Sequence, residues 1–179
     1  MSERLPSREQ ALQFLLEAGC EPNVVRHAEV VASLAVEIAQ ICSKRGFRVN
    51  LALVETGALL HDIGRSKTHS VHHAIVGAEI AKSLGLPESV ISIIKRHVGG
   101  GITVKEARKL GWPKDVYMPK TLEEKIVSYA DKLIEGSKRV PIEKTIEELS
   151  QELPRPAIQR IWKLHEEIVS LIGDSRCLA

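Results

Sequence analysis

The chain has 179 residues, of which 25 are basic and 23 acidic, and its formal net charge is +2. This length predicts one domain with a sizeable core, and the near balance of charge argues against binding to a nucleic-acid duplex. Aromatic residues are only 3% of the chain, which disfavours a base-stacking surface. No apolar run approaches the roughly 18 residues of a membrane-spanning helix, so we expect no membrane partner.

The cysteines and the N-terminal residues indicate a compartment. Cys20, Cys42 and Cys177 are odd in number and far apart, which predicts neither a disulfide framework nor a CxxC metal site. The N-terminal sequence MSERLPSREQ has no apolar signal core. Together these features favour a reducing, cytoplasmic location.

Helical periodicity begins near the N-terminus. Ser7 with Gln10 predicts a capping box, and Gly19 is expected to end that helix. Pro22 suits the first turn of a second helix, in which apolar residues recur every three or four positions as far as Gly46. The first two elements are therefore predicted to be amphipathic helices.

The same pattern continues through the middle and the end of the chain. Asn50 is expected to cap a helix that Gly64 stops, and a polar loop follows. Capping boxes at Thr103 and Thr121 predict two further helix starts. The remaining helices are predicted over 70–85, 87–98, 103–111, 121–136, 141–152 and 155–172, and a loop is predicted over 112–120. No strand alternation, internal repeat or linker is evident.

Ionisable residues lie on the apolar faces of five of these helices. His27 shares its face with Val31 and Leu34, for example, and Asp131 lies between Val127 and Ile134. Burial of unpaired charge costs several kcal/mol, whereas imidazoles and carboxylates that converge on a divalent cation offset one another. Such ligands suit Fe, Mn, Co, Ni or Zn better than Ca. The candidate metal ligands are His27, His61, Asp62, His73, His97 and Asp131.

Each of these residues also has a purely structural interpretation. A single inward histidine is more often a hydrogen-bonded core residue, and a single inward aspartate often caps a neighbouring helix. His165 also lies on an apolar face, yet it fits no ligand pattern and is interpreted as structural or surface-facing. Periodicity alone does not separate His165 from His97, so the interpretation depends on the whole set.

The ordered set resembles the HD superfamily of metal-dependent phosphohydrolases, which is named for its adjacent His-Asp pair. Here the pair lies in LLHDIGR, an HDIG-type motif, and HAIVGAEIA, IIKRHVGGG and SYADKL resemble the helices that follow it in the family. The resemblance covers roughly residues 22–136. It implies an all-α HD-domain bundle of about seven to nine helices, as a single domain over 1–179 with the helices of 141–172 packed on its core.

The resemblance also implies how the ligands are divided. The first metal would be held by His27, His61, Asp62 and Asp131. Members with two further histidines, here His73 and His97, hold a second metal that the HD aspartate bridges. The pattern is most similar to that of bacterial HD-type diadenosine tetraphosphate hydrolases, which implies a two-metal centre, with iron or manganese expected.

Several polar residues near the HD pair are candidates for substrate binding. In this interpretation Asp62 fixes the spacing of two metals, which make hydroxide available for attack on phosphorus. Arg65 and Lys67 would grip phosphate as part of the catalytic machinery, and their alternative is a solvated basic loop. His69 and Arg96 are further phosphate candidates, although the preferred interpretation of His69 is a solvated loop residue. His73 is preferred to His69 and His72 as the ligand because it fits the HA-x-x-GA pattern.

Less specific features remain open. Gly99–Gly101 either cradle a phosphate or form a helix stop, and Trp112 either covers the site or seals the edge of the core. The C-terminal helices are expected to form a packing surface or a homodimer surface.

The expected function is a phosphomonoesterase or phosphodiesterase acting on a nucleotide-like small molecule. Dinucleoside polyphosphates, cyclic 2′,3′-phosphates and nucleoside monophosphates are the substrate classes that the resemblance implies. Some HD proteins are instead di-iron oxygenases, and others are non-catalytic domains that sense ligands. Since such non-catalytic domains often lose ligands and all the expected positions are filled here, the sequence favours an active centre.

Overall fold

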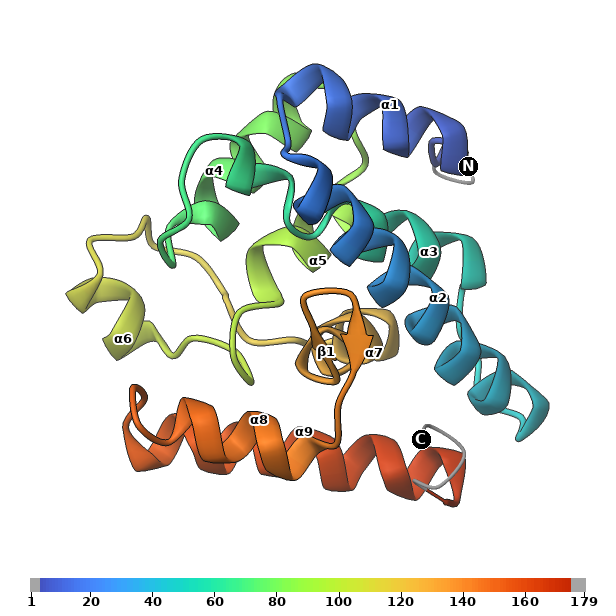
Figure 1. The fold of residues 1–179 in the computed structure, drawn as a ribbon, viewed down its shortest axis with the longest axis vertical. Coiled ribbons are helices and arrows are strands. Elements are labelled where there is room, and N and C mark those ends of the chain that lie inside the picture. The colour runs from blue at the N-terminus through green and yellow to red at the C-terminus, as the bar shows by residue number, and fades with distance from the viewer. Residues whose placement is uncertain (1–3, 175–179) are drawn as a thin grey trace.

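Nine α-helices, a short 3-10 helix and one small β-hairpin make up residues 4–174, the part of the chain that the computed structural model describes (Figure 1). The helices are α1 (Arg8–Ala18), α2 (Pro22–Lys44), α3 (Leu51–Leu60), η1 (Ile63–Ser66), α4 (His73–Ser83), α5 (Glu88–Arg96), α6 (Val104–Lys109), α7 (Leu122–Lys132), α8 (Ile142–Leu149) and α9 (Arg155–Ile172). The hairpin pairs β1 (Ile134–Glu135) with β2 (Lys138–Arg139). The predicted all-α class is confirmed.

The predicted helix caps are present. Ser7, Thr103 and Thr121 each form a capping box, and the Asn50 side chain accepts a hydrogen bond from a backbone N–H in the first turn of α3. Gly19 ends α1 in the left-handed conformation, at φ 87°. These caps satisfy backbone groups that a helix end leaves without partners, which is why short polar signals could fix the helix boundaries.

Four helices form the centre of the molecule. The 23-residue α2 packs against α3 and α7, and α5 packs against both α3 and α7. Their facing side chains are mostly Ala, Val, Leu and Ile, and many of them are completely buried. Each fully buried large aliphatic side chain stabilises the fold by roughly 1.5–3 kcal/mol. This core places the inward faces of the predicted ligand helices against one another.

The last helix closes the molecule on one side. In Figure 1, α9 runs along the lower edge, beneath α6 and α7, and it contacts α2, α7 and α8. Its buried residues recur at helical spacing and are Ala157, Ile161, Leu164, Ile168 and Ile172. The α9 helix therefore packs directly on α2 and α7, two of the four central helices.

A second, smaller cluster of buried side chains lies under α6 and the loop that follows it. Trp112 is 7% exposed, packs edge-on against Tyr117, and donates a hydrogen bond from Nε1 to Nδ1 of His72 at 2.9 Å. Ala74 and Ala107 complete the cluster. Trp112 thus seals this edge of the core, which was one of its two predicted roles.

Several predicted helix boundaries were wrong. The helix expected to start at Ser70 begins at His73, and the helix expected to stop at Gly64 ends at Leu60. The helix expected over 121–136 ends at Lys132, because the chain turns at Gly136 (φ 60°) and pairs Glu135 with Lys138 in the hairpin. The helix expected over 141–152 ends at Leu149. The hairpin is too short to produce a strand pattern in the sequence.

Two further observations concern the thiols and the helix lengths. Cys20 and Cys42 are buried free thiols, while Cys177 lies outside the described residues. Among residues 4–174, none of the helices is both long enough and apolar enough to cross a membrane.

Candidate metal centre

One half of the predicted ligand set lies between α2, α3 and α7. The Nε2 atoms of His27 and His61 are 3.0 and 3.4 Å from Oδ1 of Asp131. Oδ2 of Asp62 lies 3.6 Å from His61 Nε2 and 4.0 Å from His27 Nε2. Residues that are up to 104 positions apart in the sequence therefore converge within a few ångströms.

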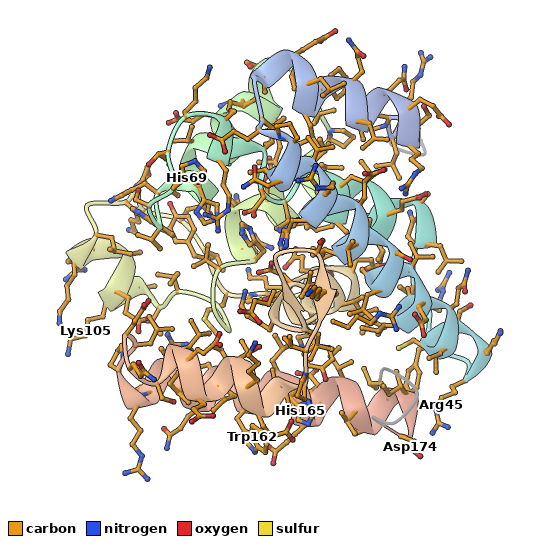
Figure 2. The ribbon with its side chains drawn as sticks, viewed as in Figure 1. Arg45, His69, Lys105, Trp162, His165 and Asp174 are labelled. Atoms are coloured by element: carbon orange, nitrogen blue, oxygen red, sulfur yellow. The ribbon has the colours of Figure 1, made fainter. Side chains whose placement is uncertain are left out.

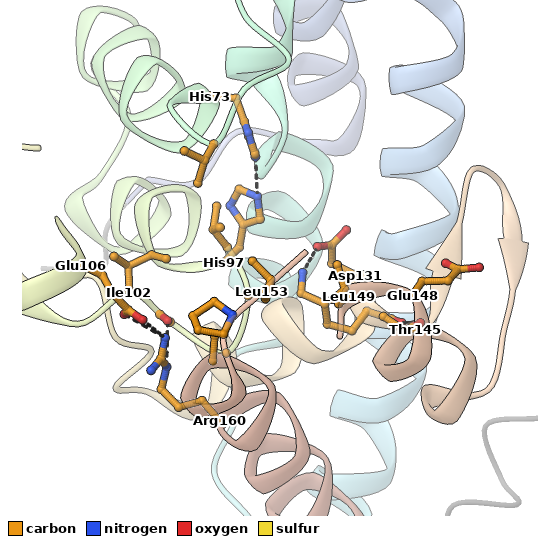
Figure 3. A pocket seen from close by; sticks show the side chains of 18 of the residues that line it. His73, His97, Ile102, Glu106, Asp131, Thr145, Glu148, Leu149, Leu153 and Arg160 are labelled. Atoms are coloured by element: carbon orange, nitrogen blue, oxygen red, sulfur yellow. Dashed lines mark hydrogen bonds and ion pairs between the residues drawn. The ribbon is translucent and has the colours of Figure 1, made fainter. Parts of the chain in front are cut away.

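The other half lies where α4 begins and α5 ends. Oδ1 of Asp62 is 3.1 Å from Nε2 of His73 and 3.4 Å from Nε2 of His97. The two imidazoles also face each other, with their Nε2 atoms 3.0 Å apart (Figure 3). Asp62 thus presents one oxygen to each half of the set.

The main chain fixes the orientation of three of these histidines in the same way. His61 and His97 directly follow the last residues of α3 and α5, and His73 is the first residue of α4. Each contacts the backbone carbonyl three residues earlier through Nδ1, at 2.6 to 2.7 Å. Since a carbonyl only accepts, Nδ1 carries the proton and donates it. In the neutral ring, Nε2 is then left with a lone pair that faces the centre.

His27 obtains the same support from a distant segment. It lies inside α2, where the neighbouring carbonyls are used by the helix, and its Nδ1 is 2.7 Å from the carbonyl of Gly136. That carbonyl belongs to the turn of the β-hairpin. The unpredicted hairpin is therefore part of the support for the centre.

The donor set fits divalent cations. The Nε2 atoms of His73 and His97 direct two lone pairs at each other across 3.0 Å, which is repulsive between neutral rings unless a cation lies beside them. Nε2 of His61 and Oδ1 of Asp62 are buried without a hydrogen-bond partner among the described residues. Groups able to hold an ion are His27–His61–Asp131 and His61–Asp62–His97. Mixed imidazole and carboxylate ligands of this kind bind transition metals.

The side chains of Lys132 and Arg65 balance the charge of the two carboxylates, Asp131 and Asp62. Burial alone would raise the pKa of Asp62, but the adjacent imidazoles, led by His61, hold this pKa well below its ordinary value. Burial likewise opposes ionisation of Asp131, and Lys132, which contacts its Oδ2, leads the groups that lower its pKa. Nε of Arg65 also donates to Oδ2 of Asp62 at 2.6 Å. Both carboxylates are therefore ionised, as ligands must be.

Burial also keeps His97 in its ligand form. His97 is 2% exposed, and burial lowers its pKa to about 4. It is therefore neutral at physiological pH, with Nε2 available to a metal.

A cavity of about 690 Å³ opens from this centre. His73, His97 and Asp131 line it, and other parts of its wall come from α6, α8 and α9 (Figure 3). The apolar side chains of its walls are Val71, Val98, Ile102, Leu110, Ile134, Leu149, Leu153, Pro154 and Ala157. A cavity of this size suits a small molecule with an apolar part.

The candidate phosphate-binding residues differ in where they lie. Arg65 and His69 line the cavity. Lys67 is exposed and does not line it. Arg96 points elsewhere, since its Nη1 pairs with the buried carboxylate of Glu124 at 2.7 Å. Substrate binding by Lys67 and Arg96 stays a prediction, and their positions do not add support to it.

Sequence reasoning missed several polar residues of the cavity. Lys132, Lys109 and Arg160 are additional cations in its walls. Lys132 directly follows Asp131 in the SYADKL motif, so the motif itself could have indicated it. No such signal marks Arg160, which lies on a helix that was expected only to pack or to form a dimer.

Two glycines allow helices to approach each other closely around the centre. A Cβ at Gly64 of the HDIG motif would lie 1.9 Å from the carbonyl oxygen of His73, and one at Gly100 would lie 2.7 Å from the backbone of Arg160 and Ile161. Gly64 therefore lets α4 pack beside the HD pair, and Gly100 lets the turn after His97 pack directly on α9.

The remaining notable ring residues are not at the centre. His165 forms a hydrogen bond with the hydroxyl of Tyr129 at 2.8 Å and packs against Trp162, which lies on the outer side of α9 (Figure 2). His72 accepts the hydrogen bond from Trp112. Neither Trp112 nor His165 lines the cavity.

The chain belongs to the HD-domain family, because the model of that family matches residues 24–136. Among its relatives, the uncharacterized protein MJ0778 of Methanocaldococcus jannaschii is 46% identical over 166 residues, covering 92% of this chain and 98% of that protein.

Other relatives are longer proteins. A tRNA (cytidine(56)-2'-O)-methyltransferase of Picrophilus torridus is 39% identical over 171 residues, so 94% of this chain matches about half (48%) of that protein. Ribonuclease Y of Chloroflexus aurantiacus is 42% identical over 77 residues, which cover 42% of this chain and 14% of that enzyme.

A solved structure shares the fold. The HD domain of the Listeria monocytogenes phosphodiesterase PgpH, in complex with cyclic-di-AMP, superposes with a TM-score of 0.54 at 21% identity. The superposition covers 91% of this chain and 95% of that domain. At this identity the similarity concerns the fold alone.

Proposed function

We propose that this chain is a metal-dependent phosphohydrolase that acts on a nucleotide-like small molecule as a phosphodiesterase or phosphomonoesterase. The proposal rests on one observation: four imidazole Nε2 atoms and two carboxylates converge at the end of a cavity of about 690 Å³. Hydrolysis of phosphate esters by metal-activated water requires such ligands beside a space for the ester.

We propose that the centre holds two ions, with iron or manganese as the expected metals and cobalt, nickel or zinc as alternatives. His27, His61 and Asp131 would hold one ion, His73 and His97 the other, and Asp62 would contact both. When bound, the ions would supply a water of lowered pKa and would offset negative charge on the phosphoryl oxygens.

The protein's own residues would orient and hold the ester. Asp62 faces both halves of the centre, and Arg65 fixes its Oδ2 through a hydrogen bond of 2.6 Å. Lys132, whose side chain is only 10% exposed, lies beside Asp131 and lines the cavity, so its ammonium can pair with a phosphoryl oxygen. Arg65 and His69 line the same space.

The size and lining of the cavity support the proposed substrate class. Its walls are largely apolar, which favours a substrate with a base or another ring and disfavours a duplex. The PgpH domain is a phosphodiesterase found with cyclic-di-AMP, which supports the test of cyclic nucleotides on this chain. The other substrates to be tested are diadenosine tetraphosphate, cyclic 2′,3′-phosphates and nucleoside monophosphates. We propose no methyltransferase activity for this chain, because it matches only 48% of the length of the tRNA methyltransferase relative.

The experiment is an anaerobic preparation reconstituted with manganese or ferrous iron, followed by a screen for phosphate-ester hydrolysis over those nucleotides and a generic aryl phosphodiester. We expect metal-dependent turnover that a chelator abolishes and that added metal restores. Oxygen consumption is measured in parallel. Uptake of oxygen without hydrolysis would favour a di-iron oxygenase, and metal binding without either reaction would favour a ligand-sensing domain.

A further inference from the structure

The part of the cavity that α6 and α9 form contains an ion pair. Arg160 of α9 and Glu106 of α6 both line it, and Nη2 of Arg160 lies 2.8 Å from each carboxylate oxygen of Glu106 (Figure 3). Ile102, Leu110 and Ala157 are apolar neighbours in the same wall. This region combines apolar side chains with one charged pair.

The guanidinium of Arg160 is held rigidly, with one nitrogen left over. Nε donates to the carbonyl of Gly101 at 3.2 Å, and Nη2 is used by Glu106. No hydrogen bond among the described residues uses Nη1. The side chain is 18% exposed and lines the cavity, so its guanidinium is only partly shielded from water.

The support of this arginine is also well ordered. Gly100 packs directly against the backbone at Arg160, which fixes the position of α9 beside the turn. Glu106 is itself anchored, since its carboxylate accepts from the backbone N–H and the hydroxyl of Thr103 at 2.8 and 2.7 Å. A donor that is fixed before binding loses little conformational entropy when a ligand arrives, which is how recognition groups are usually built.

We propose that this end of the cavity holds the base of a purine nucleotide, with Nη1 of Arg160 donating to an acceptor on the edge of the base. Both purines present N7 as an acceptor and guanine adds O6, so arginine is a common partner of this edge. The proposal rests on the proposed function, because the phosphate of such a nucleotide would lie at the metal end of the same cavity. Arg160 is then a specificity residue and takes no part in the hydrolysis.

The test compares two probes that differ only in the base. Non-hydrolysable phosphonate analogues of guanosine 5′-monophosphate and of ribose 5-phosphate are titrated into manganese-loaded protein. We expect the guanosine analogue to bind the wild type at least tenfold more tightly. In Arg160→Ala this advantage falls about tenfold or more, while the ribose analogue binds as in the wild type. Arg155→Ala, which removes an exposed arginine from the first turn of the same helix, leaves both affinities unchanged.

A conservative variant separates recognition from a structural tie between α6 and α9. Arg160→Lys keeps a positive charge beside Glu106, but its single ammonium nitrogen replaces the planar guanidinium, so no equivalent of Nη1 remains. We expect it to lose the guanosine advantage as Arg160→Ala does. Wild-type guanosine affinity in Arg160→Lys, or equal affinity of the wild type for the two probes, would overturn the inference. These titrations need no turnover, so they decide the inference separately from the hydrolysis screen.

Discussion

The two ends of the cavity are built differently. At the metal end, His61 and Asp62 are 0% and 4% exposed, and backbone carbonyls orient the histidines. At the other end, apolar side chains and a partly exposed pair, Arg160 with Glu106, come from the peripheral helices α6 and α9. Backbone carbonyls therefore orient the proposed metal ligands, while in the proposed enzyme the side chains of the peripheral helices would select the molecule that fits. Variants at the two ends should consequently affect different properties.

The largest effect is expected for Asp62→Ala. Asp62 is the residue that faces both halves of the centre, so the variant should lose both ions and all measurable hydrolysis. Metal content by mass spectrometry and hydrolysis rate are measured together. Glu79→Ala removes an exposed carboxylate from α4 and serves as the control, with wild-type metal content expected. Wild-type metal binding and activity in Asp62→Ala would defeat the assignment.

The two halves of the metal end can be separated. His73→Ala should remove one ion and keep the ion held by His27, His61 and Asp131, whereas His27→Ala should remove the latter. Hydrolysis should fall by at least roughly 100-fold in both variants. Even the loss of a residue that only hydrogen-bonds to a metal ligand can cost this much, and here a ligand itself is lost. Binding of one ion per chain in each variant is the predicted stoichiometry. If His73→Ala still bound as many ions as the wild type, the second half would not be a metal site.

A smaller effect is expected between the two ends, at Lys132. Lys132→Ala removes a cation that lines the cavity, and loss of a charged hydrogen bond of about 1.5–3 kcal/mol lowers kcat/KM by roughly 10- to 100-fold. Lys138→Ala, an exposed lysine of the hairpin, is the matched control. Should the two variants show equal kcat/KM, Lys132 would have no role in binding phosphate.

The hairpin provides a more subtle comparison. Gly136 and Gly85 both adopt positive φ, 60° and 70°, so alanine at either position costs a similar roughly 1–2 kcal/mol of strain. Only Gly136 supports a ligand, through its carbonyl and Nδ1 of His27. Gly136→Ala should weaken metal binding about tenfold, and Gly85→Ala should not. Equal metal affinity in the two variants would show that the hairpin does not support the centre.

The smallest effect concerns the ion pair at the far end. Burial would raise the pKa of Glu106, but Thr103 and Arg160 lower it below its ordinary value of 4.5. The ionised form therefore stabilises the fold above that pH, and this contribution disappears as the pH falls through the lowered pKa. Glu106→Gln should reduce the unfolding free energy by less than about 1 kcal/mol at pH 7 and by a smaller amount at pH 3. Denaturant unfolding at both pH values tests this, and an equal difference at both would contradict it.

The metal end could be predicted from the sequence because a buried charge needs a partner. Histidines and aspartates on apolar faces are few, and their ordered set resembled a known family, so the cluster and the helical class followed. His165 shows the limit of that reasoning. It has the same periodicity as His97, and only the three-dimensional structure places it against Tyr129 instead of at the centre.

The far end could not be predicted, because its residues are typical of amphipathic helices. Arg160 becomes part of the cavity only through the packing of α9 against Gly100. In the same way, the sequence does not show that Arg96 pairs with Glu124 while Lys132 faces the cavity, since that depends on the rotation of each helix against its neighbours.

The most direct test is anomalous X-ray diffraction from crystals of the manganese-loaded protein. We predict two peaks, one among His27, His61 and Asp131 and one between His73 and His97, with Asp62 in contact with both. Peaks located elsewhere, or crystals without bound metal, would contradict the account.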